Sequence, residues 1–558
     1  MNHAISEFDA ACTSSKTNLL VVAPPGCGKT ELLARRAEYL ISRLSSGQKI
    51  LALTFSNKAR DNLKDRLSKT LSCERMSRYI EVRNFHGHAA EIVRSHGATL
   101  GVSTDYTLPD KRTQDNAIDA SLNGLRNKDD LDFRRIVAEA LRDAKQKLSD
   151  DAAVLKELER TNRYAAQVEK YRQCNDIMLY DDLLRHAQRL LHVDGIAHLY
   201  KCHYGAILVD EFQDLSPQQL DIALLTCATN RTFAGDPLQG IYSWTGARPE
   251  FVERRLREIC GDPLGLGVSY RSSPRVLSLL WRVSGSLGGA QLLANQPGQW
   301  HDGGCVAGGA FSTAEAEAVA IRGAASNIVT RFPAATVGII CRNGWRRKEI
   351  DNEFLTTNTP CTRWDVEIDN PSIVEIIRNS LDRLGRTVTW ERLTHDLLGS
   401  TYATDVETVA EIREALTQIQ TLTGSHHERL ADVLSQLRIR NSDEVIPAGI
   451  HLLNAHVGKG QQFDWVFIPG LEEGNIPSFH AKRDAALLEE HRVLLVMISR
   501  ARTGVVVSRA AQRHSKAGKY YHLNPSRWCK ELQDEVTRTF EDLEDYIASM
   551  PSGNLSDD

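Results

Sequence analysis

A glycine-containing loop between a short apolar run and an amphipathic helix constrains the fold of this chain more than any other feature. In "NLLVVAPPGCGKTELLARRAEYL", Leu19–Val22 is predicted to be a strand, and a helical pattern follows the loop. Gly26 and Gly28 allow backbone N–H groups to face phosphate oxygens, and the helix N-terminus adds its dipole. Lys29 is expected to reach the β- and γ-phosphates, and the Thr30 hydroxyl to ligate Mg²⁺. The predicted nucleotide-binding loop comprises Ala23, Pro24, Pro25, Gly26, Cys27, Gly28, Lys29 and Thr30.

A second predicted strand ends in carboxylates. In "GAILVDEFQD", the β-prone run Ala206–Val209 continues directly into Asp210 and Glu211. Taken alone, this stretch is equally well explained as a surface charge cluster. Together with a phosphate loop, it supplies what a P-loop NTPase needs, because an aspartate holds Mg²⁺ and a neighbouring glutamate activates water. We therefore predict that Asp210 is a metal ligand and that Glu211 is catalytic.

Length and composition limit the remaining possibilities. A chain of 558 residues is long enough for two to four domains. Its net charge of −4 decides nothing about nucleic acid, since a binding groove can be locally basic on a neutral protein. The two nearest of its eleven cysteines, Cys12 and Cys27, are too far apart for CxxC-type metal ligation. We expect a cytoplasmic protein with reduced thiols, because the N-terminus has no signal-peptide pattern and no apolar run approaches the ~18 residues of a membrane span.

The order of patterns along the chain predicts an α/β protein with two helical insertions. Further β-type runs lie at residues 50–55, 232–234, 337–341, 465–468 and 505–508, with helical patterns between them. Two highly helical stretches lack such runs. We predict a first α/β domain (1–87 and 181–264) with a helical insertion (88–180), a second α/β domain (265–370 and 448–530) with a smaller insertion (371–447), and an acidic C-terminal tail (531–558).

Nine segments, in order, resemble those of UvrD/Rep/PcrA-type superfamily 1A DNA helicases. They are "LALTFSNKARDNLKDRL", "NFHG", "LYDDLL", "DEFQD", "AGDPLQGIYSWTGA", "SYRS", "VGIICRNGWRRKEID", "HVGKGQQFDWVFIPGLEEGNIP" and "EEHRVLLVMISRAR". The resemblance extends from the phosphate loop to about residue 510. It implies two RecA-like motor domains with parallel sheets, ATP and Mg²⁺ in the cleft between them, and 3′ to 5′ movement along single-stranded DNA.

The resemblance also implies roles for individual residues at the nucleotide. Gln213 and Gln239 are similar to the polar links between the nucleotide and DNA sites. Tyr270 would stack on the base, and Arg271 would contact the γ-phosphate. Arg500 would be the arginine finger, a residue worth ~10³–10⁵ in rate in related NTPases. A surface ion pair is the alternative explanation for either arginine.

DNA contacts are implied for five residues. Tyr242 and Trp244 alternate in "IYSW", which would place both rings on one face of an extended segment. A buried core would explain this pattern equally well, but the resemblance implies platforms on which bases stack, worth ~1–3 kcal/mol per base. Phe55 is expected to add a ring. Asn57 and His86 fall in segments similar to DNA-contacting motifs.

Four departures from the family pattern affect the expected activity. No glutamine precedes Gln48, although relatives read adenine with one upstream of the phosphate loop, and Phe8 falls near that place. The usual glutamate of the fifth motif is Gln462, which we still expect, with Gly460, at the nucleotide. The usual arginine after the motif tryptophan is Thr245. The insertion at 371–447 is also considerably shorter than in full-length relatives.

Our main hypothesis is an ATP-dependent 3′ to 5′ single-stranded DNA translocase or helicase that acts on DNA with a 3′ tail. A first alternative is a DNA-stimulated regulatory NTPase subunit, since the compact build resembles the helicase-like subunit of Gabija anti-phage systems, which works with a partner nuclease. A second alternative is a catalytically silent DNA-binding scaffold. The presence of Lys29, Asp210, Glu211 and Arg500 disfavours the scaffold, and ATPase activity would exclude it.

Overall fold

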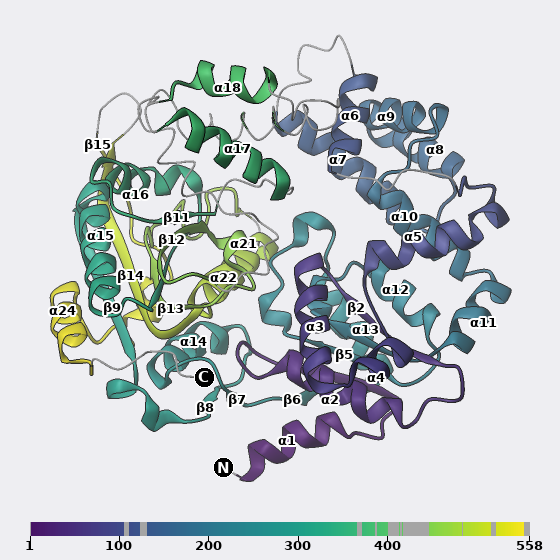
Figure 1. The fold of residues 1–558 in the computed structure, drawn as a ribbon, viewed down its shortest axis with the longest axis horizontal. Coiled ribbons are helices and arrows are strands. Elements are labelled where there is room, and N and C mark those ends of the chain that lie inside the picture. The colour runs from purple at the N-terminus through teal and green to yellow at the C-terminus, as the bar shows by residue number, and fades with distance from the viewer. Residues whose placement is uncertain are drawn as a thin grey trace. The chain divides into compact units, whose positions relative to one another are not determined.

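The computed structural model describes residues 2–104, 111–122, 131–364, 371–385, 388–399, 412, 416, 446–482, 484–514 and 520–551. The chain divides into two compact units, Met1–Gly267 and Val268–Asp558. Each unit is built around its own largely parallel β-sheet (Figure 1). The predicted α/β class, with two parallel-sheet domains and helical insertions, is confirmed.

The first sheet contains six parallel strands in the order β3-β2-β4-β5-β1-β6. Their carboxyl ends all lie at one edge of the sheet, where open α/β sheets bind their ligands. The runs predicted at 19–22, 50–55, 206–209 and 232–234 are all strands. The strands are β1 (Asn18–Val22), β2 (Lys49–Thr54), β3 (Ile80–Asn84), β4 (Tyr204–Asp210), β5 (Arg231–Gly235) and β6 (Leu264–Gly265).

Helices cover this sheet, as a parallel sheet with two apolar faces requires. Leu53, Val209 and Phe233 from the strands share one core with Phe85 and Leu183 from the helices. The helices of this part are α1 (Asn2–Cys12), α2 (Lys29–Ile41), α3 (Asn57–Thr70), α4 (Cys73–Tyr79), α5 (Phe85–His96), α10 (Tyr180–Leu191), α11 (Asp194–His203), α12 (Pro217–Thr226) and α13 (Pro249–Cys260).

The helical insertion of the first unit has a hydrophobic core of its own. Helices α6 (Lys111–Ser121), α7 (Leu131–Lys145), α8 (Asp151–Thr161) and α9 (Arg163–Cys174) pack around residues such as Leu141, Leu158 and Val168 (Figure 1). Most of helix α5 falls in the predicted insertion range of 88–180, and its Ile92 and Val93 are buried in the core of the first sheet. The separate core of the insertion is formed by residues that follow α5.

The second sheet has the strand order β11-β12-β10-β13-β14-β15, with β9 also paired to β14. All these pairings are parallel except that of β15. The runs predicted at 337–341, 465–468 and 505–508 are strands, and the last belongs to a much longer one. The strands are β9 (Cys305–Thr313), β10 (Thr336–Cys341), β11 (Thr362–Arg363), β12 (Gly449–Asn454), β13 (Phe463–Ile468), β14 (Ala501–His514) and β15 (Tyr520–His522). A separate pair joins β7 (Val268–Ser269) to β8 (Leu293–Ala294).

Two groups of helices pack on the second sheet. Helix α15 (Ala314–Arg331) packs against α16 (Gly344–Thr356), and α14 (Pro274–Ser286) packs against α22 (Asp484–Ile498) (Figure 1). The short helices α21 (Ala455–Gly458) and α23 (Cys529–Gln533) complete this part. Of the predicted insertion at 371–447, the structure describes α17 (Pro371–Leu384), α18 (Trp390–Gly399) and little else. Among the described residues, no helix is both long and apolar enough to cross a membrane.

Part of the predicted acidic tail belongs to the second unit. Helix α24 (Phe540–Ser549) packs on α15 and β9. Its Leu543, Tyr546 and Ile547 are buried in the core of the second sheet. Acidic residues occupy the exposed positions of this amphipathic helix, which explains why composition alone indicated a tail. Residues 552–558 lie outside the described part of the chain.

A largely buried ion cluster joins the insertion to the first sheet's helices. The Lys145 ammonium at the end of α7 lies 3.0 Å from Glu169 and 2.8 Å from Asp182, and all three side chains are completely buried. Asp182 belongs to α10, which packs on α5 and α12. Burial opposes ionisation of Asp182, but Lys145 and two arginines outweigh it and lower its pKa.

Two arginines and a third carboxylate complete the cluster. Arg172 contacts Glu169 at 2.7 Å and Asp151 at 2.9 Å, while Arg185 contacts Asp182 at 2.9 Å and also pairs with Asp151. Three cations thus face three carboxylates. Burial raises the pKa of Asp151, but Arg172 and Arg185 lower it further, to about 2. The stabilising effect of this carboxylate is therefore present at neutral pH and is lost as the pH falls from about 4 towards 2.

Replacing Lys145 by Met should destabilise the first unit strongly. Glu169 and Asp182 would lose a shared cation in a buried site, and breaking a buried pair from one side costs about 3–5 kcal/mol. Denaturant unfolding followed by intrinsic fluorescence measures the loss. Lys147→Met is the matched control, because the Lys147 side chain is 57% exposed and pairs with Glu157 at the surface. Equal unfolding midpoints for the two variants would show that the buried cluster adds no stability.

Candidate functional site

The phosphate loop has the backbone geometry that its glycines predict. Gly26 and Gly28 have φ angles of 80° and 79°, in the left-handed region that glycine occupies without steric cost. Gly28 is the N-cap of α2, and no side chain caps that end of the helix. The Ala23 N–H donates to the Gly235 carbonyl at 2.8 Å, which ties the loop to the end of β5. The loop therefore presents a helix N-terminus suited to an anion.

Cys27 fills the loop without taking part in its chemistry. Its side chain is buried, and its thiol contacts the Leu266 carbonyl at 3.7 Å. All eleven cysteines, each within the described part of the chain, are free thiols. Burial raises the pKa of several of them, that of Cys12 to about 11, so these thiols stay protonated at neutral pH.

Lys29 lies against both predicted carboxylates. Its ammonium is 3.2 Å from Asp210 and in closer contact with Glu211. Burial alone would lower the pKa of Lys29, but the two carboxylates outweigh burial and raise it. Burial raises the pKa of Asp210, although Lys29 works against this. The structure thus brings together the lysine after β1 and the acidic pair after β4.

Glu211 has a strained backbone. Its φ and ψ angles are 55° and 50°, in the left-handed region that non-glycine residues rarely enter and that costs about 1–3 kcal/mol. Its N–H donates to the Asp210 carboxylate at 2.9 Å. The turn directs the chain from β4 into a short 3₁₀ helix, η2 (Phe212–Asp214). Strain of this kind clusters at functional sites, and here it falls on the residue predicted to be catalytic.

A chain of hydrogen bonds connects Glu211 to Gln239. The Gln213 side-chain amide donates to Glu211 at 2.5 Å, and its oxygen accepts the Asp236 N–H at 3.0 Å. The Asp236 carboxylate in turn accepts from the Gln239 amide at 2.9 Å. Asp236 is buried, which raises the pKa of its carboxyl. The structure therefore joins Gln213 and Gln239, both predicted as polar links, through Asp236.

Asp236 was missed in the sequence, although its position contains a usable signal. It follows β5 directly, and Asp210 is the last residue of β4. Strand β5 lies between β4 and β1 in the sheet, so an acidic residue at its carboxyl end reaches the same edge.

The oxygen ligands at this edge suit a hard divalent cation that also binds a nucleotide. Asp210 offers a carboxylate and Thr30, in the first turn of α2, a hydroxyl. Within the described residues, no cluster of three or more His, Cys, Asp or Glu could hold a metal by itself. Mg²⁺ is commonly held by one or two carboxylates and by substrate phosphates, so these residues fit it.

The residues predicted to contact DNA are only partly brought together. The rings of Phe55 and Tyr242 stack with centroids 5.6 Å apart and planes 16° apart. His86 packs edge-on against Tyr180 at 5.0 Å, and burial lowers its pKa to about 4, so it is neutral at pH 7. Asn57 is the first residue of α3. Its side chain lies outside the described part of the structure.

The expectation of an extended "IYSW" segment is wrong. Ser243–Thr245 form a 3₁₀ turn, η4, closed by Gly246 with a φ angle of 95°. Alternation therefore does not place Tyr242 and Trp244 on one face. The Trp244 side chain lies outside the described part of the chain.

In the second unit, both predicted arginines meet at one turn. The Arg271 guanidinium donates to the Ser499 carbonyl at 3.3 Å. Arg500 donates to the Ser499 hydroxyl at 2.7 Å and makes a long contact of 3.5 Å to the Gln461 carbonyl. Each arginine is thus held by uncharged oxygen atoms of Ser499.

The other nucleotide residues of the second unit differ in exposure. The Tyr270 ring is 50% exposed and can offer a face to a base. Gly460 has a φ angle of 85°, which turns the chain ahead of β13, and Gln462 is exposed whereas its neighbour Gln461 is buried. Gln462 therefore points its amide to solvent, next to the loop whose carbonyl Arg500 contacts.

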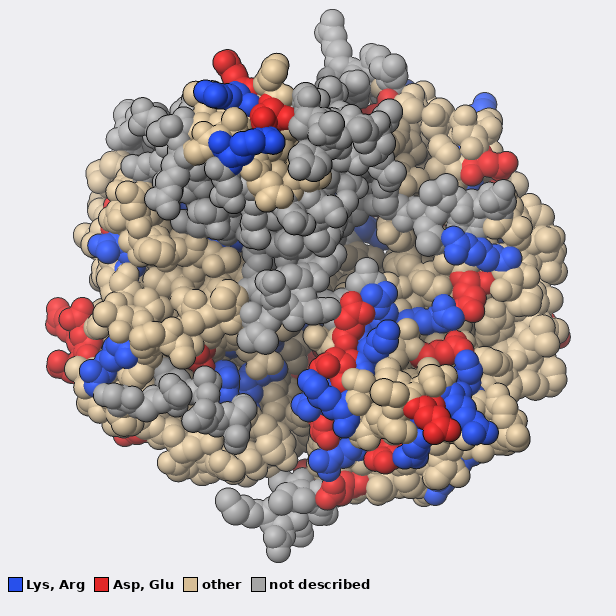
Figure 2. Space-filling model, in the orientation of Figure 1, with Lys and Arg blue, Asp and Glu red and all other residues tan. Residues whose placement is uncertain are grey.

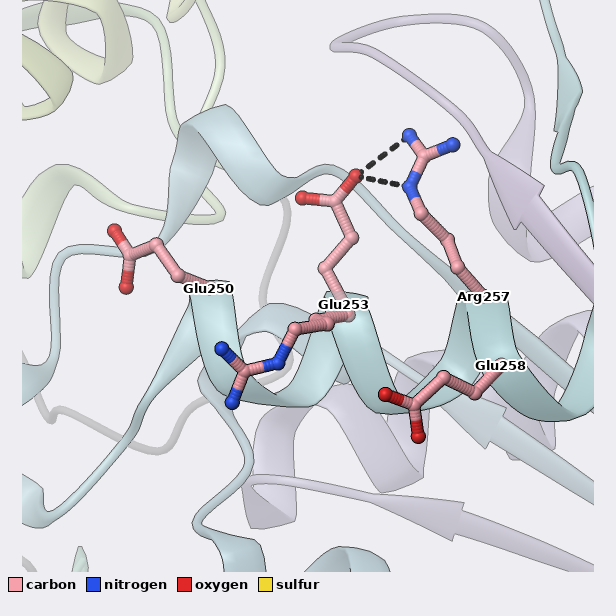
Figure 3. A pocket seen from close by; sticks show the side chains of 5 residues that line it. Glu250, Glu253, Arg257 and Glu258 are labelled. Atoms are coloured by element: carbon pink, nitrogen blue, oxygen red, sulfur yellow. Dashed lines mark hydrogen bonds and ion pairs between the residues drawn. The ribbon is translucent and has the colours of Figure 1, made fainter.

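Two other surface features of the first unit consist of charged side chains. Figure 2 shows basic and acidic side chains intermixed over helices α2–α4, in agreement with ion pairs such as Arg75–Glu38 and Lys69–Asp65. A shallow depression of about 540 Å³ lies along α13 (Figure 3). None of the predicted site residues lines it. Its lining consists of charged side chains of both signs, those of Glu250, Glu253, Arg254, Arg257 and Glu258.

Comparison with known proteins identifies the family. Residues 6–259 match the UvrD/REP helicase N-terminal domain, and residues 372–512 match the UvrD-like helicase C-terminal domain. The ATP-dependent DNA helicase UvrD2 of Mycobacterium tuberculosis is 28% identical over 563 residues, covering 91% of this chain and 78% of the relative. DNA helicase II of Escherichia coli is 24% identical, covering 94% and 86%. The ATP-dependent DNA helicase PcrA of Staphylococcus aureus is 23% identical, covering 96% and 87%.

The two family models match residues in both units. The two parallel-sheet units are accordingly the two RecA-like helicase domains of that family. The chain belongs to the UvrD/Rep/PcrA-type helicases, a family of superfamily 1 P-loop ATPases.

Proposed function

We propose that this protein is an ATP-dependent translocase that moves 3′ to 5′ along single-stranded DNA, with Mg²⁺ as the metal. The observation that carries this proposal is the contact of Lys29 with Asp210 and Glu211 at the edge of the first sheet. It supplies a phosphate-binding cation, a metal-binding carboxylate and a base within one cluster. The relatives' names, which specify ATP-dependent DNA helicases, support the same reaction. The cytoplasm is the proposed compartment.

In this proposal, the loop residues and Lys29 bind the nucleotide phosphates. Lys29 exchanges part of its contact with the carboxylates for phosphate oxygens. Asp210 and Thr30 hold Mg²⁺, which neutralises charge on the β- and γ-phosphates when bound. Glu211 accepts a proton from the attacking water, and its hydrogen bond from Gln213 fixes the direction of its carboxylate. Arg271 and Arg500 stabilise negative charge on the transferred phosphoryl group.

The hydrogen-bonded chain through Asp236 supports a link between hydrolysis and DNA. Gln239 precedes the turn that contains Tyr242, whose ring stacks on Phe55. A change in the contacts of Glu211 is passed through Gln213 and Asp236 to the start of this turn. Phe55, Asn57, His86, Tyr242 and Trp244 are the proposed DNA contacts; the neutral His86 would act as a hydrogen-bonding or stacking group rather than as a cation.

Lys29→Ala and Glu211→Gln should each abolish DNA-stimulated ATP hydrolysis. The first removes the phosphate-binding cation. The second removes the base, a loss of about 10²–10⁴ in rate, and should leave ATP binding intact. Steady-state phosphate release with and without single-stranded oligonucleotide measures turnover, and a fluorescent ATP analogue measures binding. Lys69→Ala, at an exposed ion pair on α3, is the control and should match the wild type. Substantial hydrolysis by either site variant contradicts the assignment, and a wild type without ATPase activity points to a DNA-binding scaffold.

The protein should hydrolyse GTP within roughly tenfold of ATP, a discrimination of only about 1.4 kcal/mol. No glutamine precedes the phosphate loop, so the base would be held mainly by stacking on the half-exposed Tyr270 ring, and every base has a π-face. Unlabelled GTP and ATP are made to compete for hydrolysis, and the ratio of their kcat/KM values is measured. Tyr270→Ala should lower kcat/KM for all nucleotides by similar factors. A preference for ATP of several orders of magnitude would mean that another residue reads the base.

The isolated chain should translocate well and unwind duplexes poorly. The alignment with the Escherichia coli helicase runs over 636 residues although this chain has only 558, so that relative carries segments absent here. We propose that the short insertion at 371–447 provides little grip on the duplex and that a partner protein, such as a nuclease, supplies the missing contact. Single-turnover unwinding of a 3′-tailed duplex is compared with translocation along the bare strand.

The two assays separate the motor from its duplex contact. The single-stranded segments have equal length in both assays, so that their signals can be compared. The Glu211→Gln variant is the blank that shows whether each signal requires hydrolysis. Rapid translocation with little unwinding is the expected result. Efficient, processive unwinding by the chain alone would show that the short insertion is sufficient and would remove the reason for a partner.

A further inference from the structure

Ser499 occupies the turn between α22 and β14 in the second unit. It is completely buried and directly precedes Arg500. Its hydroxyl donates to the Val496 carbonyl at 2.8 Å, one turn back in the helix. This bond fixes the hydroxyl's orientation, so that its lone pairs point towards the following side chain.

The Ser499 hydroxyl accepts two hydrogen bonds from one edge of the Arg500 guanidinium. Nη2 of Arg500 lies 2.7 Å and Nε 3.2 Å from this oxygen. Nε also donates to the Val496 carbonyl at 3.0 Å. Hydrogen bonds along the Nε–Nη2 edge fix the plane of the guanidinium and the direction in which it points. The remaining N–H groups point away from Ser499.

The backbone of the same residue anchors the second arginine. The Ser499 carbonyl accepts from Nη1 of Arg271 at 3.3 Å. The residues after Arg271 run alongside the start of β14, where the Ser272 hydroxyl donates to the Ala501 carbonyl at 2.7 Å. The Ser273 N–H also donates to the Arg502 carbonyl at 2.8 Å. Both arginines are thus hydrogen-bonded to the same turn, at Ser499.

We infer that Ser499 is a positioning residue for hydrolysis, which acts through Arg500. Its hydroxyl holds the guanidinium by one edge, so that the outer N–H groups are oriented before the phosphoryl group is transferred. A donor that is already oriented needs no reorganisation at the transition state. This role rests on the proposed function of Arg500 as the residue that stabilises the transferred phosphoryl group.

Ser499→Ala isolates the hydroxyl, because it leaves the carbonyl that anchors Arg271 unchanged. Hydrogen bonds to charged groups are strong enough that kcat should fall about tenfold to a hundredfold. The dissociation constants for nucleotide and for single-stranded DNA should stay within about twofold, since the oriented arginine acts mainly in the transition state. Ser499→Thr keeps the hydroxyl and should retain most of the wild-type kcat.

A double-mutant cycle with Arg500→Ala tests whether Ser499 acts through Arg500. Single-turnover hydrolysis of labelled ATP measures the wild type, both single variants and the double variant. The loss caused by Ser499→Ala should disappear in the Arg500→Ala background, because there is no guanidinium left to orient. Thermal melting of each variant identifies any loss that comes from unfolding.

Three outcomes would overturn the role of Ser499. Ser499→Ala could turn over at the wild-type rate while Arg500→Ala is defective. The loss from Ser499→Ala could be equally large in both backgrounds. Ser499→Thr could be as defective as Ser499→Ala although both melt like the wild type. A fully active Arg500→Ala variant would instead refute the proposed role of Arg500 itself, so the two failures are distinguishable.

Discussion

The chemistry of the first unit depends on one cation shared by two carboxylates. Lys29 follows β1 and the acidic pair follows β4, with β5 between them in the sheet. Neighbouring strands lie about 4.8 Å apart, so the two strand ends are separated by roughly 10 Å. Only a long cationic side chain bridges that gap. Lys29 does so without leaving the first turn of α2, and the same side chain therefore belongs to the phosphate loop and to the carboxylate pair.

The strand between them explains how this cluster is connected to more distant residues. Gly235 ends β5, and a Cβ atom there would lie 2.3 Å from the Gln213 amide oxygen. The absence of a side chain lets Gln213 reach across the end of β5 to the Asp236 N–H. Gly235 also accepts the hydrogen bond from Ala23 in the phosphate loop. The end of β5 is thus in contact both with the phosphate loop and with the Gln213 side chain that follows β4.

Local patterns in the sequence predicted the strands and the proximity of Lys29 to Asp210 and Glu211, because both depend on short-range features. An apolar run followed by Gly–Lys–Thr or by Asp–Glu predicts a strand of a parallel sheet, with these polar residues at the edge where the strand ends. Asp236 and Ser499 were not predicted, because their importance comes from contacts with Gln213 and Arg500 across the fold. The "IYSW" prediction failed for a related reason. Alternation assumed an extended backbone, whereas Gly246, with its positive φ, closes the segment into a 3₁₀ turn. Helix α5 is apolar on the face that contributes to the core of the first sheet, a long-range contact that its charged sequence does not reveal.

The chain contains two kinds of buried charge, and their difference separates structural from reactive groups. In the insertion, Lys145, Arg172 and Arg185 balance Asp151, Glu169 and Asp182. Three cations face three carboxylates there, so this cluster holds its helices together without a further ion. At the sheet edge, by contrast, the single ammonium of Lys29 contacts both Asp210 and Glu211, and burial raises the pKa of Asp210. A divalent cation bound there with phosphates would supply the positive charge that favours ionised Asp210. In the proposed mechanism, nucleotide and metal would complete the charge balance of this site, whereas the cluster of three cations and three carboxylates balances itself.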